Sequence, residues 1–237
     1  MQPSAPTKPP RRVALTLALA VPTLMAIAGA GLIVTCATAA PAPAAAEPAA
    51  DAAAVAAALA RFQQATAGQK DAIEPAAEQL LALSSRHPQD PVLRAYAGAA
   101  TSMRATTTML PWRKMAYADD GLGLIDKALA QLTPQHDQAL HRGVPALLET
   151  RFVAATSFLA LPAMFNRGER GRSLLQQVLG SPLLDPAPLP FRAAVWMRAA
   201  RLAEADKQPA EARKWYQLAA DSGTPVADAA RERLKSL

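Results

Sequence analysis

The residues of this sequence best suited to acid–base or metal chemistry are its three histidines. His136 and His141 are five positions apart, so they do not share a helix face. Asp137 and His141 do share one, but no cysteine or second histidine completes a metal-binding set. We therefore interpret His136 and His141 as surface turn residues, and His87, which precedes a proline, as structural. The sequence predicts no metal site.

Glu149 is a second candidate, because it lies in the most apolar of the expected helices, 144–161. A buried carboxylate needs a charged partner or a raised pKa. Arg142, Arg151 or an arginine of 166–172 could supply that partner. No second carboxylate lies at a spacing that suggests acid–base catalysis. The pattern favours an ion pair that holds helices together, and we interpret 166–172 as a charged turn rather than an anion site.

The stretch 104–117 holds the best candidate for binding. Trp112 is followed by Arg113 and Lys114, and a tryptophan beside cations can anchor a partner protein or lie among lipid headgroups. In the other interpretation, Trp112 folds back into the helical core, where the stretch lengthens a helix. A third hypothesis places a small-molecule or catalytic pocket around Glu149 and 104–117.

The rest of the sequence argues against catalysis and against nucleic-acid binding. It has no Gly-rich phosphate loop, no GxSxG and no HExxH motif, so we expect no enzymatic activity and no cofactor. The net charge is +6 and the pI about 9.8. Without the basic residues of 1–39 the charge falls to +3. The remaining charges are interspersed and form no basic stripe with aromatics, so nucleic acid is not an expected partner.

These residues should be positioned by helices alone. The chain is 51% hydrophobic, with much alanine and few aromatics, a composition that favours closely packed helices. No alternating segment is long enough to predict a strand. Helical periodicity and end signals predict an all-α domain with helices near 51–67, 73–85, 91–103, 121–132, 144–161, 173–179, 193–205, 209–221 and 226–237.

The segment Ala193–Pro225 resembles the tetratricopeptide repeat (TPR), and its AxxWYxxAAxxG pattern resembles the Sel1-like branch. Two helices turn at 206–208, and their small residues permit close approach. A second TPR-like unit runs from Pro91 to Pro134, with about 11 extra residues near 104–117 that we expect to lengthen its first helix. The residues on signature positions are Gly98, Trp196, Ala200, Ala212, Tyr216 and Ala219.

The resemblance implies a stack of α-α hairpins that forms a right-handed solenoid. The equivalent positions Ala76, Gly121, Gly171 and Ala212 lie 45, 50 and 41 residues apart. A strict TPR repeats every 34 residues, so we expect irregular repeats. A generic helical bundle remains the alternative.

The resemblance also implies a function in protein interaction or assembly. TPR-like stacks bind peptides or partner domains in the groove formed by their first helices. Here these helices carry basic side chains, which favour an acidic or C-terminal carboxylate ligand. The candidate groove residues are Arg94, Arg104, Arg151, Arg198 and Arg201.

The N-terminal residues predict an address outside the cytoplasm. Arg11 and Arg12 precede the uncharged apolar run 13–35 and then small residues, the order of a secretory signal. Its 23 residues also suffice to span a bilayer, and Cys36, the only cysteine, leaves a lipoprotein signal as a third possibility. All three interpretations imply a bacterial envelope location, either soluble in the periplasm or anchored to the inner membrane with the N-terminus inside.

We therefore divide the chain into a signal or signal anchor at 1–39, an Ala/Pro linker at 40–50 and a helical repeat domain at 51–237. An anchored form could serve as an accessory subunit of a membrane transport or secretion complex.

Overall fold

Helices form most of the domain. The computed structural model describes residues 46–237, so the predicted leader 1–39 and most of the linker lie outside the described residues. The helices are α1 (Ala46–Thr66), α2 (Ile73–Arg86), α3 (Pro91–Met103), α4 (Pro111–Ala130), α5 (Ala146–Ala160), α6 (Gly168–Leu179), α7 (Leu189–Ala205), α8 (Pro209–Asp221) and α9 (Ala227–Lys235). The predicted all-α class is confirmed.

The connections are short and partly 3-10 helical. The 3-10 turns between 46 and 237 are η1 (Lys70–Ala72), η2 (Arg104–Thr106), η3 (Pro134–Asp137) and η4 (Ala163–Phe165). Two-residue strands β1 (Leu140–His141) and β2 (Val144–Pro145) form an antiparallel ladder that pairs Leu140 with Pro145 and His141 with Val144. None of the described helices is both long and apolar enough to cross a membrane.

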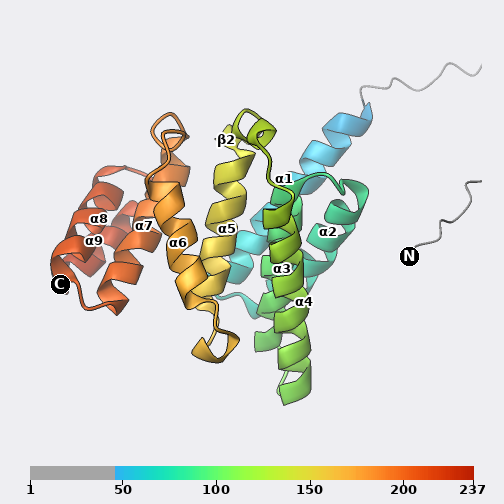
Figure 1. Ribbon diagram of the computed structural model, residues 1–237, viewed down its shortest axis with the longest axis horizontal. Helices are drawn as coiled ribbons and strands as arrows, with labels where there is room; N and C mark the ends of the chain where they lie inside the picture. The colour runs from blue at the N-terminus through green and yellow to red at the C-terminus, as the bar shows by residue number, and fades with distance from the viewer. Residues whose placement is uncertain (1–45) are drawn as a thin grey trace, which may run out of the picture. The chain divides into compact units, whose positions relative to one another are not determined.

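Helices that follow one another in the sequence pack against each other (Figure 1). The main pairs are α1 with α2, α3 with α4, α5 with α6 and α7 with α8, while α9 covers α8. The pairs are joined by contacts of α3 with both α2 and α5, and of α6 with α7. The arrangement brings the middle helices, α3 to α6, into the centre of the domain.

Local sequence signals explain where several helices begin. Asp90 caps α3, because its Oδ1 accepts hydrogen bonds from the backbone nitrogens of Val92 at 2.8 Å and Leu93 at 3.1 Å. Pro91, Pro111 and Pro209 are the first residues of α3, α4 and α8, where a proline loses no helical hydrogen bond.

Two boundaries differ from the sequence prediction. Helix α1 begins at Ala46, five residues before Asp51 and inside the predicted linker, because alanine is the strongest helix former and Pro48 lies in the first turn. The extra residues near 104–117 were expected to lengthen α3, but α3 ends at Met103. They form η2, a short link and the first turns of α4, which begins at Pro111 rather than near Gly121.

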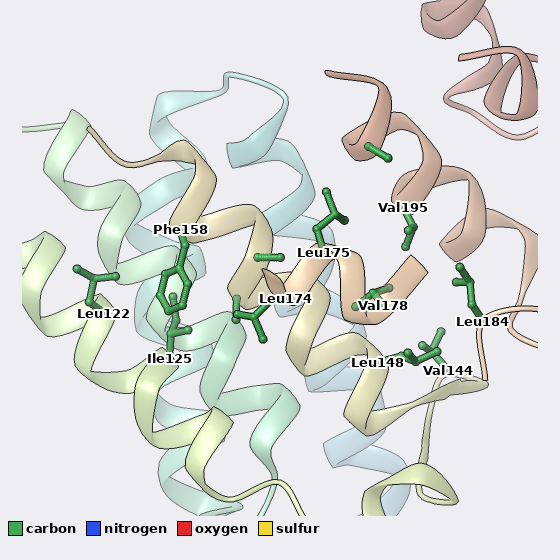
Figure 2. Close-up of a cluster of buried hydrophobic side chains, with 13 residues drawn as sticks. Leu122, Ile125, Val144, Leu148, Phe158, Leu174, Leu175, Val178, Leu184 and Val195 are labelled. Carbon is green, nitrogen blue, oxygen red and sulfur yellow. The ribbon is translucent and has the colours of Figure 1, made fainter. Parts of the chain in front are cut away.

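Large aliphatic side chains and Phe158 form the central core. Figure 2 shows Phe158 beside Leu122 and Ile125 of α4. Leu148, Leu175, Val178 and Val195 extend the same cluster across α5, α6 and α7. The burial of these side chains supplies most of the hydrophobic stabilisation of the domain.

Small residues set the helix spacing elsewhere, as the signature positions predict. Ala200, Ala212 and Ala219 are fully buried with Tyr216, and Trp196 packs against them. Gly98 lies against Gly121, and a Cβ added to Gly98 would approach the Gly121 carbonyl oxygen to 2.6 Å. Helices α3 and α4 therefore pack with almost direct backbone contact.

Candidate binding groove

A cavity of about 750 Å³ opens where the ends of several helices meet. Its wall on one side is the beginning of α4, including Met115, and on the other side the turn η4, including Phe165. Phe62 of α1 and Met103 of α3 complete its apolar lining. We call this cavity the groove. Its volume lies in the range of ligand-binding pockets.

The hydroxyl groups in the groove do not make its surface polar. Ser102, Thr156 and Ser157 donate to the backbone carbonyl oxygens four residues earlier, Gly98 at 3.1 Å, Phe152 at 2.7 Å and Val153 at 2.8 Å. Because these hydroxyls already donate within their own helices, the groove favours an apolar ligand.

The beginning of α4 extends past its neighbours (Figure 1). All six residues from Pro111 to Ala116 are exposed. Trp112 is 67% exposed and Met109, just before the helix, 86%. Trp112 thus does not fold back into the core, and this alternative interpretation is wrong. Across the groove, Met164 of η4 is 71% exposed.

Met115 and Met164 line the groove, and Met109, Leu110 and Trp112 lie just before Met115 in the sequence. We treat these five exposed side chains as one candidate surface. Large apolar side chains exposed together around a cavity are typical of interaction sites, and methionines adapt to varied apolar ligands. We use the term apolar rim for Met109, Leu110, Trp112, Met115 and Met164.

Of the described residues that line the groove, Lys114 alone is ionisable. Among the described residues, neither Lys114 nor Arg113 forms an ion pair. Both lie in the first turns of α4, where the helix dipole disfavours cations, and Leu110 provides no side-chain cap. The groove therefore presents one unpaired positive charge beside an apolar surface.

The five arginines predicted to make a basic groove lie elsewhere; none lines this cavity. The Nε of Arg104 donates to Glu74 Oε2 at 2.9 Å, and its guanidinium lies 4.5 Å from the centre of the Tyr117 ring. The Nη2 of Arg94 donates to the Pro88 carbonyl oxygen at 2.8 Å.

The remaining three arginines are Arg151 on α5 and Arg198 and Arg201 on α7. Burial lowers the pKa of Arg198, and the charge of Arg201 lowers it further. The groove is consequently apolar rather than basic, because none of the five arginines is among its lining residues.

Glu149 is buried at the start of α5 and has three partners. Tyr96 donates its hydroxyl to Oε1 at 2.8 Å, His141 Nδ1 donates to Oε2 at 2.9 Å, and Arg142 forms a close ion pair. Of the candidate partners that the sequence offers for Glu149, Arg142 is the one that forms the ion pair, and Arg151 does not. His141 is mostly buried and structural, so its assignment as a surface turn residue is wrong.

Electrostatics keep this carboxylate ionised. Burial alone would raise the pKa of Glu149, but the hydrogen bond and charge of His141, the charge of Arg142 and the Tyr96 hydroxyl outweigh burial and lower it. Burial and the adjacent Glu149 charge raise the pKa of Tyr96. The group therefore acts as a fixed polar link between α3, the β1–β2 turn and α5.

Glu149 and 104–117 do not form one pocket. The groove is lined by residues of 104–117 but not by Glu149. A smaller cavity of about 310 Å³ borders His141, Arg142 and His87, and there His87 Nε2 lies 3.0 Å from Asp51 Oδ2. Within the part of the chain that the structure describes, no group of acidic, histidine and cysteine side chains could hold a metal ion.

The arginines of 166–172 are engaged in ion pairs. Arg167 and Arg170 bind Asp126 of α4 at 2.9 and 2.5 Å, and Arg172 binds Asp206 at the end of α7, with one contact at 2.7 Å. These contacts link α6 to its neighbours on both sides. The interpretation of 166–172 as a turn is wrong, because α6 already begins at Gly168 and includes Arg170 and Arg172.

Comparisons of this chain with family models, with curated proteins and with solved structures find no match.

Proposed function

We propose that this chain is a non-catalytic, TPR-like repeat module that binds a partner protein through the groove and the apolar rim. The hairpin pairs, irregular in length, suit a right-handed solenoid in which α1, α3 and α5 contribute to the groove. The leader 1–39 favours a periplasmic or membrane-anchored form. An anchored form would suit an accessory subunit of an envelope complex.

This proposal depends on one observation: the apolar groove has Met164 in its lining, and Met109 and Trp112 are exposed close in sequence to its α4 residues. Exposing Met109, Trp112 and Met164 to water is unfavourable for the free protein. A partner that covers them would remove this unfavourable exposure. The apolar lining, with Lys114 as its single ionisable side chain, offers no pair of groups for acid–base catalysis.

Photo-crosslinking in the native host tests this function. A photoreactive amino acid at Met115 or at Met164 of the full chain should give discrete adducts with one partner protein. The same probe at Leu218 of α8, which is as exposed as Met115 at 40%, should not. Adding Trp112→Ser should reduce the Met115 adducts severalfold, because the rim loses its largest contact.

The proposal is wrong if the probes at Met115, Met164 and Leu218 give the same adducts in the same yield. Such a result would show that the rim makes only random encounters.

A further inference from the structure

The shape of the groove suits a helix. Its α4 wall from Pro111 to Ala118 spans seven residue steps, about 10 Å at 1.5 Å per residue. The side chains at positions i, i+3, i+4 and i+7 of a bound helix would extend over the same length. Small residues, Ala99, Ala118 and Ala160, line the cavity and leave depth for such side chains.

Other modes of peptide recognition fit less well. Strand addition needs a free sheet edge, and the two-residue strands β1 and β2 are not part of the groove. Recognition of proline-rich segments uses aromatic-lined grooves, but among the described lining residues Phe62 and Phe165 are the only aromatics. Methionine and alanine dominate instead, as in grooves that take amphipathic helices.

The charge of the groove favours an acidic residue on that helix. Lys114 lies beside the apolar lining, and none of the described residues that line the groove is acidic. Arg113 and Lys114 have no acidic residue three or four positions away in α4 that could neutralise them. A carboxylate on the partner would supply the missing counter-charge and would also interact favourably with the N-terminal end of the α4 dipole.

The hollow shape of the groove favours a protein over a bilayer. Residues of α1, α3, α4, α5 and η4 line a cavity of about 750 Å³. A partner helix can place its side chains in such a cavity, whereas peripheral binding to a bilayer uses apolar side chains on an exposed helix face.

From these four observations we infer that the groove binds an amphipathic α-helix of a partner protein, with its apolar stripe in the groove and a carboxylate against Lys114. This inference rests on the proposed partner-binding function and adds the chemistry of the bound segment.

Three fluorescent 18-residue helical peptides test it. They share a leucine stripe at i, i+3, i+4 and i+7 and differ only in one flanking residue, Glu, Gln or Lys. Binding to the full chain is measured by fluorescence anisotropy at low ionic strength. The Glu peptide should bind about tenfold more tightly than the Lys peptide, and added salt should narrow this ratio.

The matched variants Lys114→Glu and Arg113→Glu make the test specific. Both reverse one charge in the first turns of α4, but only Lys114 lines the groove. Lys114→Glu should reverse the preference, so that the Lys peptide binds best, whereas Arg113→Glu should keep the wild-type order. Neither variant should lower the melting temperature, because an acid there suits the helix dipole.

The possible failures are distinct. Equal affinity for all three peptides in every variant would show that the groove does not recognise a carboxylate, while the apolar binding of a helix would stand. Crosslinks at Met115 and Met164 without peptide binding would refute the helical ligand, while the proposed partner-binding function would stand. If neither crosslinks nor peptide binding were observed, both the proposed function and this inference would be refuted. The protein could instead bind anionic phosphatidylglycerol vesicles but none of the peptides. If Lys114→Glu weakened that vesicle binding, a membrane surface would replace the partner helix as the ligand of the groove.

Discussion

Gly121→Ala is expected to lower the free energy of unfolding by about 3 kcal/mol, the upper part of the range for overpacked cores. A Cβ at this position would lie 2.5 Å from the Gly98 carbonyl oxygen and 2.7 Å from the Ser102 nitrogen. Both are backbone atoms, so α3 and α4 would have to move apart. Urea unfolding followed by circular dichroism measures the change.

Gly123→Ala is the matched control in the same helix. No atom lies within 4 Å of a Cβ built there, and alanine is the better helix former, so this variant should be more stable by about 1 kcal/mol. Ser102→Ala should rescue Gly121→Ala only in part, because the Gly98 carbonyl remains in the way. Equal stability of Gly121→Ala and Gly123→Ala would contradict the close α3–α4 contact.

The sequence predicts this packing well because local periodicity determines which helix face is buried. Gly98, Ala200, Ala212 and Ala219 are all buried, as their spacing in amphipathic helices requires. The caps at Asp90 and the first-turn prolines are likewise local signals. Helix existence and the identity of the close contacts could therefore be predicted residue by residue.

The extra residues near 104–117 show the limit of that reasoning. Their number could be counted from the repeat length, but the prediction that they extend α3 is wrong. Three threonines, 106–108, interrupt the helical pattern, and Pro111 restarts it as a first helical residue. With that signal used, Trp112 and Met115, three positions apart, would have been recognised as neighbours on a free helix face.

The groove itself could not be predicted, because it depends on contacts between distant elements. Phe62 and Met164 are about a hundred residues apart in the sequence but line one cavity. Similarly, the sequence names Arg142 as one of several candidate partners of Glu149, whereas Tyr96 precedes Glu149 by 53 residues. No periodicity links two such positions.

Glu149→Gln is the second variant with a large expected effect. It should lower the free energy of unfolding by about 2–3 kcal/mol at pH 7, because the amide removes the charge that faces Arg142 and His141 in a buried site. This loss is smaller than that expected for breaking a fully buried ion pair, because the Arg142 side chain is 45% exposed and partly solvated. Glu169→Gln is the control: Glu169 is 93% exposed beside Arg172 and should change stability by less than about 0.5 kcal/mol.

The pH dependence isolates the charge of Glu149. Its pKa is lowered in the folded protein, so its ionised form adds stability above the unfolded pKa of about 4.3. That contribution is lost as the pH falls through the lowered pKa of the folded state. The difference between wild type and Glu149→Gln should therefore be constant from pH 7 to about 5 and shrink toward pH 3. A difference that stays constant to pH 3 would mean that shape rather than charge explains the effect.

Glu149→Gln should also change the position of a side chain that lines the groove. Tyr96, which Glu149 holds, makes an edge-to-face contact with Phe62 at 5.2 Å between ring centres, and Phe62 lines the groove. Glu149→Gln should therefore reduce crosslinking from Met115 under conditions in which the protein remains folded, whereas Glu169→Gln should not. Unchanged crosslinking would show that Glu149 stabilises the domain without positioning the groove.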